Sequence, residues 1–191
     1  TPPAAEAFDW LVVMGGPMGV ADEALYSWLV AEKVAIRKVL ERDMPVLGIC
    51  LGAQLLAEVA GGRVEKNPQR EIGWFPVRLG GGTSPLLQGL PEEFAAFHWH
   101  GDRFHAPAGG LVLAESDGCP AQILQVGAGA IGFQFHLEST PERIIALMDN
   151  CPEDMAPGQF VQTRDGIGHA MENCAESNRL MHRVLENFLD S

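Results

Sequence analysis

The chain has 191 residues and a mass of 20.6 kDa, enough for one domain whose hydrophobic core needs neither disulfides nor a structural metal. Hydrophobic residues make up 47% and charged residues 20%, which excludes a disordered acidic chain and a coiled coil. The formal net charge of −12 repels nucleic-acid phosphates and anionic lipid headgroups. We therefore expect a single domain over residues 1–191, with neither nucleic acid nor a membrane as a partner.

The cysteine spacing and the apolar stretches indicate the cellular compartment of the protein. The four cysteines are widely spaced and form no Cys-x-x-Cys pair, which argues against a zinc site and a disulfide framework. The uncharged stretches 44–57 and 118–137 are interrupted by Pro, Gly and Gln, and the amino end lacks the apolar core of a signal peptide. These features predict a cytoplasmic protein.

The first third of the chain predicts alternating strands and helices. Apolar runs at 8–14 and 45–49 are typical of strands buried on both faces. Between them, apolar residues at helical spacing predict a crossover helix over 22–42. A second helix is expected over 51–60, ended by the glycines at 61–62. This order indicates an α/β fold with a parallel sheet covered by helices on both faces.

The middle of the chain is rich in predicted strands. Short strands separated by Gly, Pro and Asp turns are expected at 73–79, 93–99, 110–114, 121–126 and 130–135. Helices are expected at 141–149, which begins with proline, and at 172–189, which would pack on the sheet. The predicted fold is therefore α/β, with a mostly parallel sheet and a small β-rich middle segment.

The sequence Gly-Ile-Cys-Leu-Gly at 48–52 follows a predicted strand and opens a predicted helix. Glycines on either side of a nucleophile permit the sharp turn of a nucleophile elbow. The helix N-terminus then directs its dipole and its backbone N–H groups toward the Cys50 thiol. The alternative for such a short motif is a buried cysteine in a Gly-rich turn.

A thiol nucleophile needs a base and a group that orients the base. His136 and Glu138 end a predicted strand, where residues two apart point to the same side. They can therefore hydrogen-bond, which would fix the imidazole tautomer and turn the other ring nitrogen toward Cys50. The alternative is a strand-end histidine hydrated by solvent.

A third Gly-rich segment, Gly-Gly-Pro-Met-Gly at 15–19, follows the first predicted strand. Such a turn can bring a backbone N–H close to the reaction centre. It could instead bind phosphate, but it lacks the lysine of a Walker loop and the G-x-G-x-x-G spacing. A plain loop is the remaining alternative.

Taken together, the motifs make the sequence resemble the class I (triad) glutamine amidotransferases, and above all stand-alone domains related to the amidotransferase half of GMP synthetase. The resemblance covers residue 9 to about residue 142. It rests on Val-Met-Gly-Gly-Pro-Met at 13–18, Leu-Gly-Ile-Cys-Leu-Gly-Ala-Gln at 47–54, Glu-Ile-Gly-Trp-Phe-Pro at 71–76, Trp-His-Gly-Asp at 99–102 and Gly-Phe-Gln-Phe-His-Leu-Glu at 132–138.

The resemblance implies a flavodoxin-like fold and hydrolysis of the glutamine side-chain amide through a cysteine thioester, with no cofactor or metal. A synthetase or another acceptor-binding protein would be the partner. The implied catalytic residues are Cys50 as nucleophile, His136 as base and Glu138 as orienting acid, with the backbone N–H groups of Gly16 and Leu51 as the oxyanion hole. The residues implied to line the glutamine site are Gly15, Gln54, His100, Gly101 and Asp102.

Two departures from the family pattern point to a subfamily whose ammonia acceptor differs from that of GMP synthetase. Ala53 stands where histidine is common after the elbow, and Leu137 stands where proline is common between His136 and Glu138. Neither removes a catalytic group. A γ-glutamyl peptidase or hydrolase with the same triad, and a non-catalytic regulatory subunit with the same fold, remain as alternatives.

Two further expectations concern the middle and the amino end. His98 and His100 should share one side of a strand, opposite Trp99, and no metal is expected because a fourth ligand is missing.

In the related fold a strand and a helix precede the first strand seen here, so about 30 residues or more are expected to be missing. An exposed edge or an apolar groove beside the strand at 8–14 would result.

Overall fold

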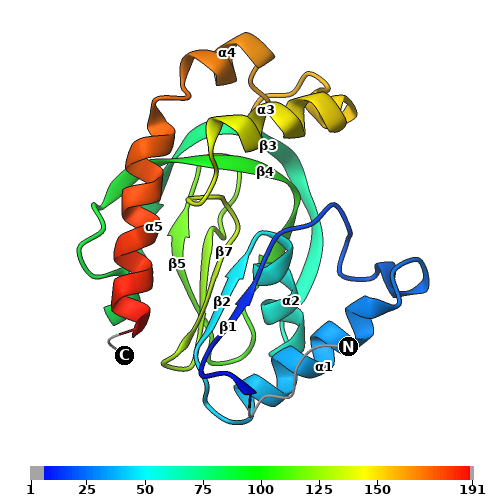
Figure 1. Ribbon diagram of the computed structural model, residues 1–191, viewed down its shortest axis with the longest axis vertical. Coiled ribbons are helices and arrows are strands. Elements are labelled where there is room, and N and C mark those ends of the chain that lie inside the picture. The colour runs from blue at the N-terminus through cyan, green and yellow to red at the C-terminus, as the bar shows by residue number, and fades with distance from the viewer. Residues whose placement is uncertain (1–6, 190–191) are drawn as a thin grey trace.

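The structure, a computed structural model, describes residues 7–189 (Figure 1). The strands are β1 (Leu11–Val13), β2 (Val46–Ile49), β3 (Arg63–Leu79), β4 (Glu93–His105), β5 (Leu111–Glu115), β6 (Ile123–Val126) and β7 (Ala130–Phe133). The α-helices are α1 (Trp28–Leu40), α2 (Leu51–Val59), α3 (Pro141–Asn150), α4 (Arg164–His169) and α5 (Asn173–Leu189). Short 3₁₀ segments are η2 (Asp22–Ala24), η3 (Pro85–Leu87) and η4 (Pro152–Met155). Within this part of the chain, no helix combines the length and apolar character that crossing a membrane requires.

The strands form one mixed sheet in the order β1-β2-β7-β6-β5-β3-β4, so the α/β class is confirmed but the expectation of a mostly parallel sheet is wrong. Only the β1–β2 and β2–β7 pairs are parallel, and all the other neighbouring pairs are antiparallel. The physical reason is the connections: β5, β6 and β7 follow one another through short turns, which can join only antiparallel strands. The parallel part is confined to the strands that carry the Gly-rich turn, the elbow and His136.

The β-rich middle segment is larger than expected and continues the same sheet. Strands β3 and β4 pair along almost their whole lengths and curl around one end of the molecule (Figure 1). Their register shifts between Lys66 and Glu71. The first ten residues of β3 escaped prediction because they are mostly charged or polar and show no apolar alternation.

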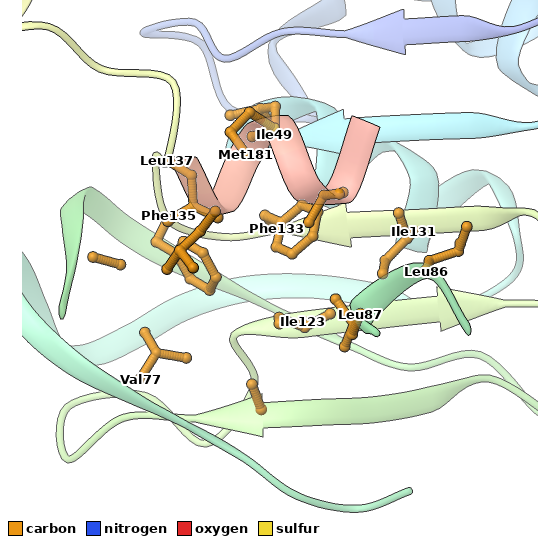
Figure 2. Packing of buried hydrophobic residues seen from close by; sticks show 14 of the residues in the cluster. Ile49, Val77, Leu86, Leu87, Ile123, Ile131, Phe133, Phe135, Leu137 and Met181 are labelled. Carbon is orange, nitrogen blue, oxygen red and sulfur yellow. The ribbon is translucent and has the colours of Figure 1, made fainter. Parts of the chain in front are cut away.

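Helices cover both faces of the sheet. One core cluster lies between the sheet and α5, and Figure 2 shows Phe133, Phe135 and Met181 meeting there. A second cluster joins the other face of the parallel strands to α1 and α2. A third packs Phe97 and Trp99 of β4 against α3 and α4. The elbow between β2 and α2 therefore sits where the first two clusters meet.

The predicted helices are otherwise close to those observed, with two differences. The helix expected over 22–42 is divided into η2 and α1. Helix α4 was not predicted, because its six residues include two glycines and are too few to show a helical period. Its N-terminus is capped by the Thr163 side chain, which accepts a hydrogen bond from the Gly166 backbone N–H at 3.2 Å.

An apolar groove of about 340 Å³ lies between β1, at the edge of the sheet, and α1. Val12 and Trp28 in its lining are 38% and 45% exposed. This is the groove expected beside the first strand. It contains none of the predicted catalytic residues.

Candidate active site

Cys50 occupies a strained turn between β2 and α2. Its backbone has φ 52° and ψ −107°, a conformation that non-glycine residues adopt rarely and usually at functional sites. The flanking glycines are required by packing: a Cβ on Gly52 would lie 2.0 Å from the Val13 carbonyl oxygen, and one on Gly48 would lie 2.6 Å from the Gly52 carbonyl. The Cys50 N–H donates to the Phe133 carbonyl at 2.7 Å, which ties the turn to the end of β7. The turn has the geometry of a nucleophile elbow.

His136 and Glu138 follow β7, and the structure brings both to the Cys50 side of the sheet. His136 Nδ1 lies 2.7 Å from Glu138 Oε1, and the His136 backbone N–H donates to the Phe97 carbonyl at 2.8 Å. Gly15 packs against both reactive side chains, because a Cβ there would lie 3.3 Å from Cys50 Cβ and 3.3 Å from His136 Cε1. The imidazole is thus held between a carboxylate and the thiol.

The electrostatics of the pair favour the charged forms. Burial opposes a charge on His136, but the Glu138 carboxylate and a hydrogen bond to Cys50 outweigh it and raise the pKa of His136 to about 10. Burial would likewise raise the pKa of Glu138, yet the charge of His136 and their hydrogen bond hold it below its ordinary value. At neutral pH the two side chains form an imidazolium–carboxylate pair.

This pair predicts a pH-dependent contribution to stability. A histidine whose pKa is raised from 6.5 to about 10 stabilises the fold fully below pH 6.5, and that stabilisation disappears as pH rises through 10. We expect Glu138→Gln to lower the free energy of unfolding at pH 7, and this deficit to shrink by about 1–3 kcal/mol by pH 10.5. Urea denaturation of both proteins at the two pH values measures it. A deficit of equal size at pH 7 and 10.5 would contradict the ion pair.

The predicted oxyanion residues also meet beside the elbow. Leu51 is the first residue of α2, and a Cβ on Gly16 would approach the Leu51 side chain to 3.3 Å. Gly16 belongs to the turn after β1, which pairs in parallel with β2. Two strand ends therefore bring both residues to the N-terminus of α2, where backbone N–H groups lack partners within the helix.

The predicted glutamine-binding residues fall into two groups. Gly15 lies at Cys50, and Gln54 is close by: its Nε2 donates to Gln134 Oε1 at 3.2 Å. By contrast, His100 is buried against Glu71, and Asp102 forms a 2.7 Å ion pair with Lys66.

Gly101 packs near Arg70, since a Cβ on this glycine would lie 3.4 Å from Arg70 Cγ. Like His100 and Asp102, it contacts a residue of β3. The glutamine-binding role of these three residues stays a prediction.

Two groups at the thiol were not predicted. Gln134 Nε2 lies 3.8 Å from Cys50 Sγ, and the Trp99 carbonyl oxygen lies 3.8 Å from the same sulfur. Strand alternation could have indicated Gln134, because it stands two residues before His136. A backbone carbonyl such as that of Trp99 leaves no signal in a sequence.

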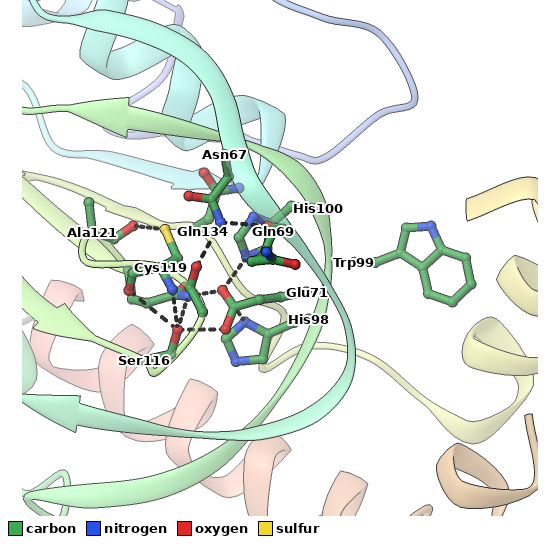
Figure 3. Close-up of polar contacts among 12 residues, drawn as sticks. Asn67, Gln69, Glu71, His98, Trp99, His100, Ser116, Cys119, Ala121 and Gln134 are labelled. Atoms are coloured by element: carbon green, nitrogen blue, oxygen red, sulfur yellow. Dashed lines mark hydrogen bonds and ion pairs between the residues drawn. The ribbon is translucent and has the colours of Figure 1, made fainter. Parts of the chain in front are cut away.

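The histidines of β4 join a buried polar cluster beside the site. Figure 3 shows His98 and His100 turned to one side of β4 and Trp99 to the other, as expected. Their partner is Glu71 on β3, and the three potential ligand atoms lie within 4.8 Å of one another. Both carboxylate oxygens of Glu71 are already bonded, by Ser116 Oγ at 2.6 Å and by Gln122 Nε2 at 2.7 Å. Burial lowers the pKa of His98 to about 3, so that ring is neutral.

Sequence relatives identify the family of the chain. The family "Glutamine amidotransferase class-I" matches residues 2–151. The glutamine amidotransferase-like protein YfeJ of Salmonella typhimurium is 36% identical over 194 residues, covering 99% of this chain and 80% of that protein. The glutamine-hydrolyzing GMP synthase of Dehalococcoides mccartyi is 29% identical over 192 residues, but this chain spans only 35% of its length.

Solved structures give the same result. A glutamine amidotransferase from Methylobacillus flagellatus superimposes with a TM-score of 0.91 at 29% identity, covering 100% of this chain and 79% of the other. One from Thermotoga maritima gives 0.86 at 28% identity, covering 100% and 82%. With the family matched over most of its length, the chain belongs to the class-I glutamine amidotransferases.

Proposed function

We propose that this chain is a glutaminase that hydrolyses the side-chain amide of glutamine and supplies the ammonia to an acceptor. The observation that carries the proposal is the contact of the His136 imidazole with both the Glu138 carboxylate and the Cys50 thiol. A nucleophile, a base and an orienting acid in this arrangement perform acyl transfer. Glutamine as the substrate follows from the family to which the chain belongs.

Acylation of the thiol is the first half of the proposed reaction. Cys50 Sγ attacks the amide carbon of glutamine as the thiolate, with its proton already held by the His136 imidazolium, and the carbonyl oxygen becomes an oxyanion. The backbone N–H groups of Gly16 and Leu51 stabilise that oxyanion. The C–N bond then breaks, His136 donates the proton to the leaving nitrogen, and ammonia leaves behind a Cys50 thioester.

Hydrolysis of the thioester completes the cycle. Water attacks the thioester carbon and gives a proton to His136, and the C–S bond breaks to release glutamate. The sulfur leaves as the thiolate, and His136 keeps the proton, which restores the imidazolium. Glu138 stays ionised throughout and stabilises the imidazolium, as the lowered pKa of its carboxyl favours.

We further propose that the ammonia is used by a synthetase or another acceptor-binding partner. Support comes from the GMP synthases, of which this chain matches only 14–35%, so that most of each enzyme lies outside the matched part. Glutamine turnover by this chain alone should then be slow and should rise when the partner binds. The partner would meet the face that carries residues 15–19, the elbow and His136.

Ammonia release from glutamine and from γ-glutamyl peptides, measured as kcat/KM for the isolated protein, tests the function. Slow turnover confined to glutamine is the expected result, and Cys50→Ala serves as the blank. A preference for peptides at an ordinary enzymatic rate would instead identify a γ-glutamyl hydrolase. A folded protein that turns over neither substrate, with or without candidate partners, would identify a non-catalytic subunit.

A further inference from the structure

Two groups outside the proposed triad contact the Cys50 sulfur, and both are buried. The Trp99 carbonyl oxygen lies 3.8 Å from Sγ, and Gln134 Nε2 lies 3.8 Å from it on another strand end. Gln134 is fully buried, and Trp99 is 9% exposed. The amide N–H of Gln134 is a donor that can stabilise negative charge on the sulfur. Glu71 contacts residues that position both of these groups.

The first connection runs through β4. Glu71 on β3 is the register partner of His100, directly after the irregularity that begins at Lys66. His100 Nε2 lies 3.1 Å from Glu71 Oε2. This contact fixes the position of β4 at His100, the residue that follows Trp99. The same stretch of β4 accepts the His136 backbone N–H through the Phe97 carbonyl at 2.8 Å. This short segment therefore touches both the nucleophile and its base.

The second connection runs through β6 and β7. Gln122 Nε2 donates to Glu71 Oε2 at 2.7 Å. The Gln122 carbonyl accepts the Gln134 backbone N–H at 2.9 Å, and the Gln134 side chain reaches the Cys50 sulfur. Gln54 holds the Gln134 amide from the other side at 3.2 Å, which fixes its orientation.

Glu71 is suited to hold these groups because it is ionised although fully buried. Burial alone would raise the pKa of Glu71, but hydrogen bonds from His100 and Ser116 hold it below its ordinary value. Gly118 packs closely against the Glu71 carboxylate, since a Cβ there would lie 2.7 Å from Glu71 Oε1. An amide in this place could accept at only one atom, so one of the surrounding donors would lose its partner.

We propose that Glu71 is a positioning residue for the nucleophile: through His100 and through Gln122 it holds the Trp99 carbonyl and the Gln134 amide against the Cys50 sulfur. The effect on catalysis rests on the proposed function, whereas the effect on the thiol does not. Glu71 does not touch the substrate in this role. It acts on the reactivity of a sulfur that other residues contact directly.

The test is the rate at which iodoacetamide alkylates Cys50, followed by peptide mass spectrometry at a fixed neutral pH and well below the melting temperature. Glu71→Gln is expected to slow this alkylation about fivefold or more, the equivalent of one hydrogen bond. Gln122→Leu breaks only the second connection and should slow it by a smaller factor. It also keeps the proposal testable if Glu71→Gln does not fold.

Two controls separate positioning from a general loss of stability. Leu29→Ala creates a cavity near the N-terminal end of α1 and touches no member of the Glu71 network. Val39→Ala creates a cavity in α1, in the core cluster on the opposite side of the sheet from α5. Both should lower the melting temperature and leave the alkylation rate of Cys50 unchanged.

The outcomes separate this inference from the proposed function. Slower alkylation in Glu71→Gln, with no glutamine turnover in the wild type, would support positioning and reject the glutaminase. An unchanged or faster alkylation rate would overturn positioning whatever the wild type does with glutamine. A stoichiometric divalent metal in the purified wild type, lost in Glu71→Gln, would make Glu71 a metal ligand and would also overturn the proposal.

Discussion

Cys50→Ala is expected to lower kcat for glutamine hydrolysis by about 10⁴-fold or more, because no other group can form the thioester. The fold should survive, since the substitution removes one atom from a side chain that is 8% exposed. Ammonia release under saturating glutamine measures the activity, and circular dichroism checks the fold. Substantial residual turnover in a folded Cys50→Ala protein would contradict the assignment of the nucleophile.

Chemical labelling provides the matched control for this prediction. A glutamine-like electrophile should modify Cys50 alone, because the other thiols lie away from the His136 base. Burial raises the pKa of Cys119 to about 12 and raises the pKa of Cys151 and Cys174, so their thiolate forms are scarce at neutral pH. Preferential labelling of any of these three would show that the nucleophile is a cysteine other than Cys50.

The two partners of Cys50 should give graded losses. His136→Ala removes the group that carries the proton in both halves of the reaction, so its kcat should approach that of Cys50→Ala. Glu138→Gln keeps a side chain that can still accept from Nδ1 and therefore should retain more activity than His136→Ala. The reverse order would assign the base to a different residue.

The sequence predicted those parts of the site that depend on local backbone geometry. An elbow needs small residues around the nucleophile, and Gly48 and Gly52 stand where any Cβ would collide with backbone. His136 and Glu138 stand two apart at a strand end, and this spacing alone placed both on one side. Local rules of this kind apply before the tertiary fold is known.

Features that depend on pairing between distant segments were missed or wrong. The sheet was expected to be mostly parallel because the first strands alternate with helices, but the later strands pair through short turns. Glu71 received no role because its partners His100, Ser116 and Gln122 come from other strands. A charged residue in a strand ordinarily indicates an exposed face, and only the tertiary structure shows that this carboxylate is buried.

Gly52→Ala is expected to lower the free energy of unfolding by about 3 kcal/mol or more, the largest effect on stability that we predict. The new Cβ would lie 2.0 Å from the Val13 carbonyl oxygen and 2.7 Å from its carbonyl carbon, and a backbone group cannot rotate away as a side chain can. This clash can be relieved only if β1 moves away from α2, but β1 is also paired with β2. Urea denaturation followed by circular dichroism measures the loss.

Gly168→Ala is the matched control, because this glycine also lies in a helix but a Cβ there meets nothing within 4 Å. It should leave stability unchanged or raise it by about 0.4–1 kcal/mol, since alanine restricts the unfolded chain. Equal stability of the two variants would contradict the close approach of β1 to α2. Because the turn after β1 carries Gly15 and Gly16, any Gly52→Ala protein that still folds should also lose activity: the movement that relieves Val13 displaces the backbone proposed to stabilise the oxyanion.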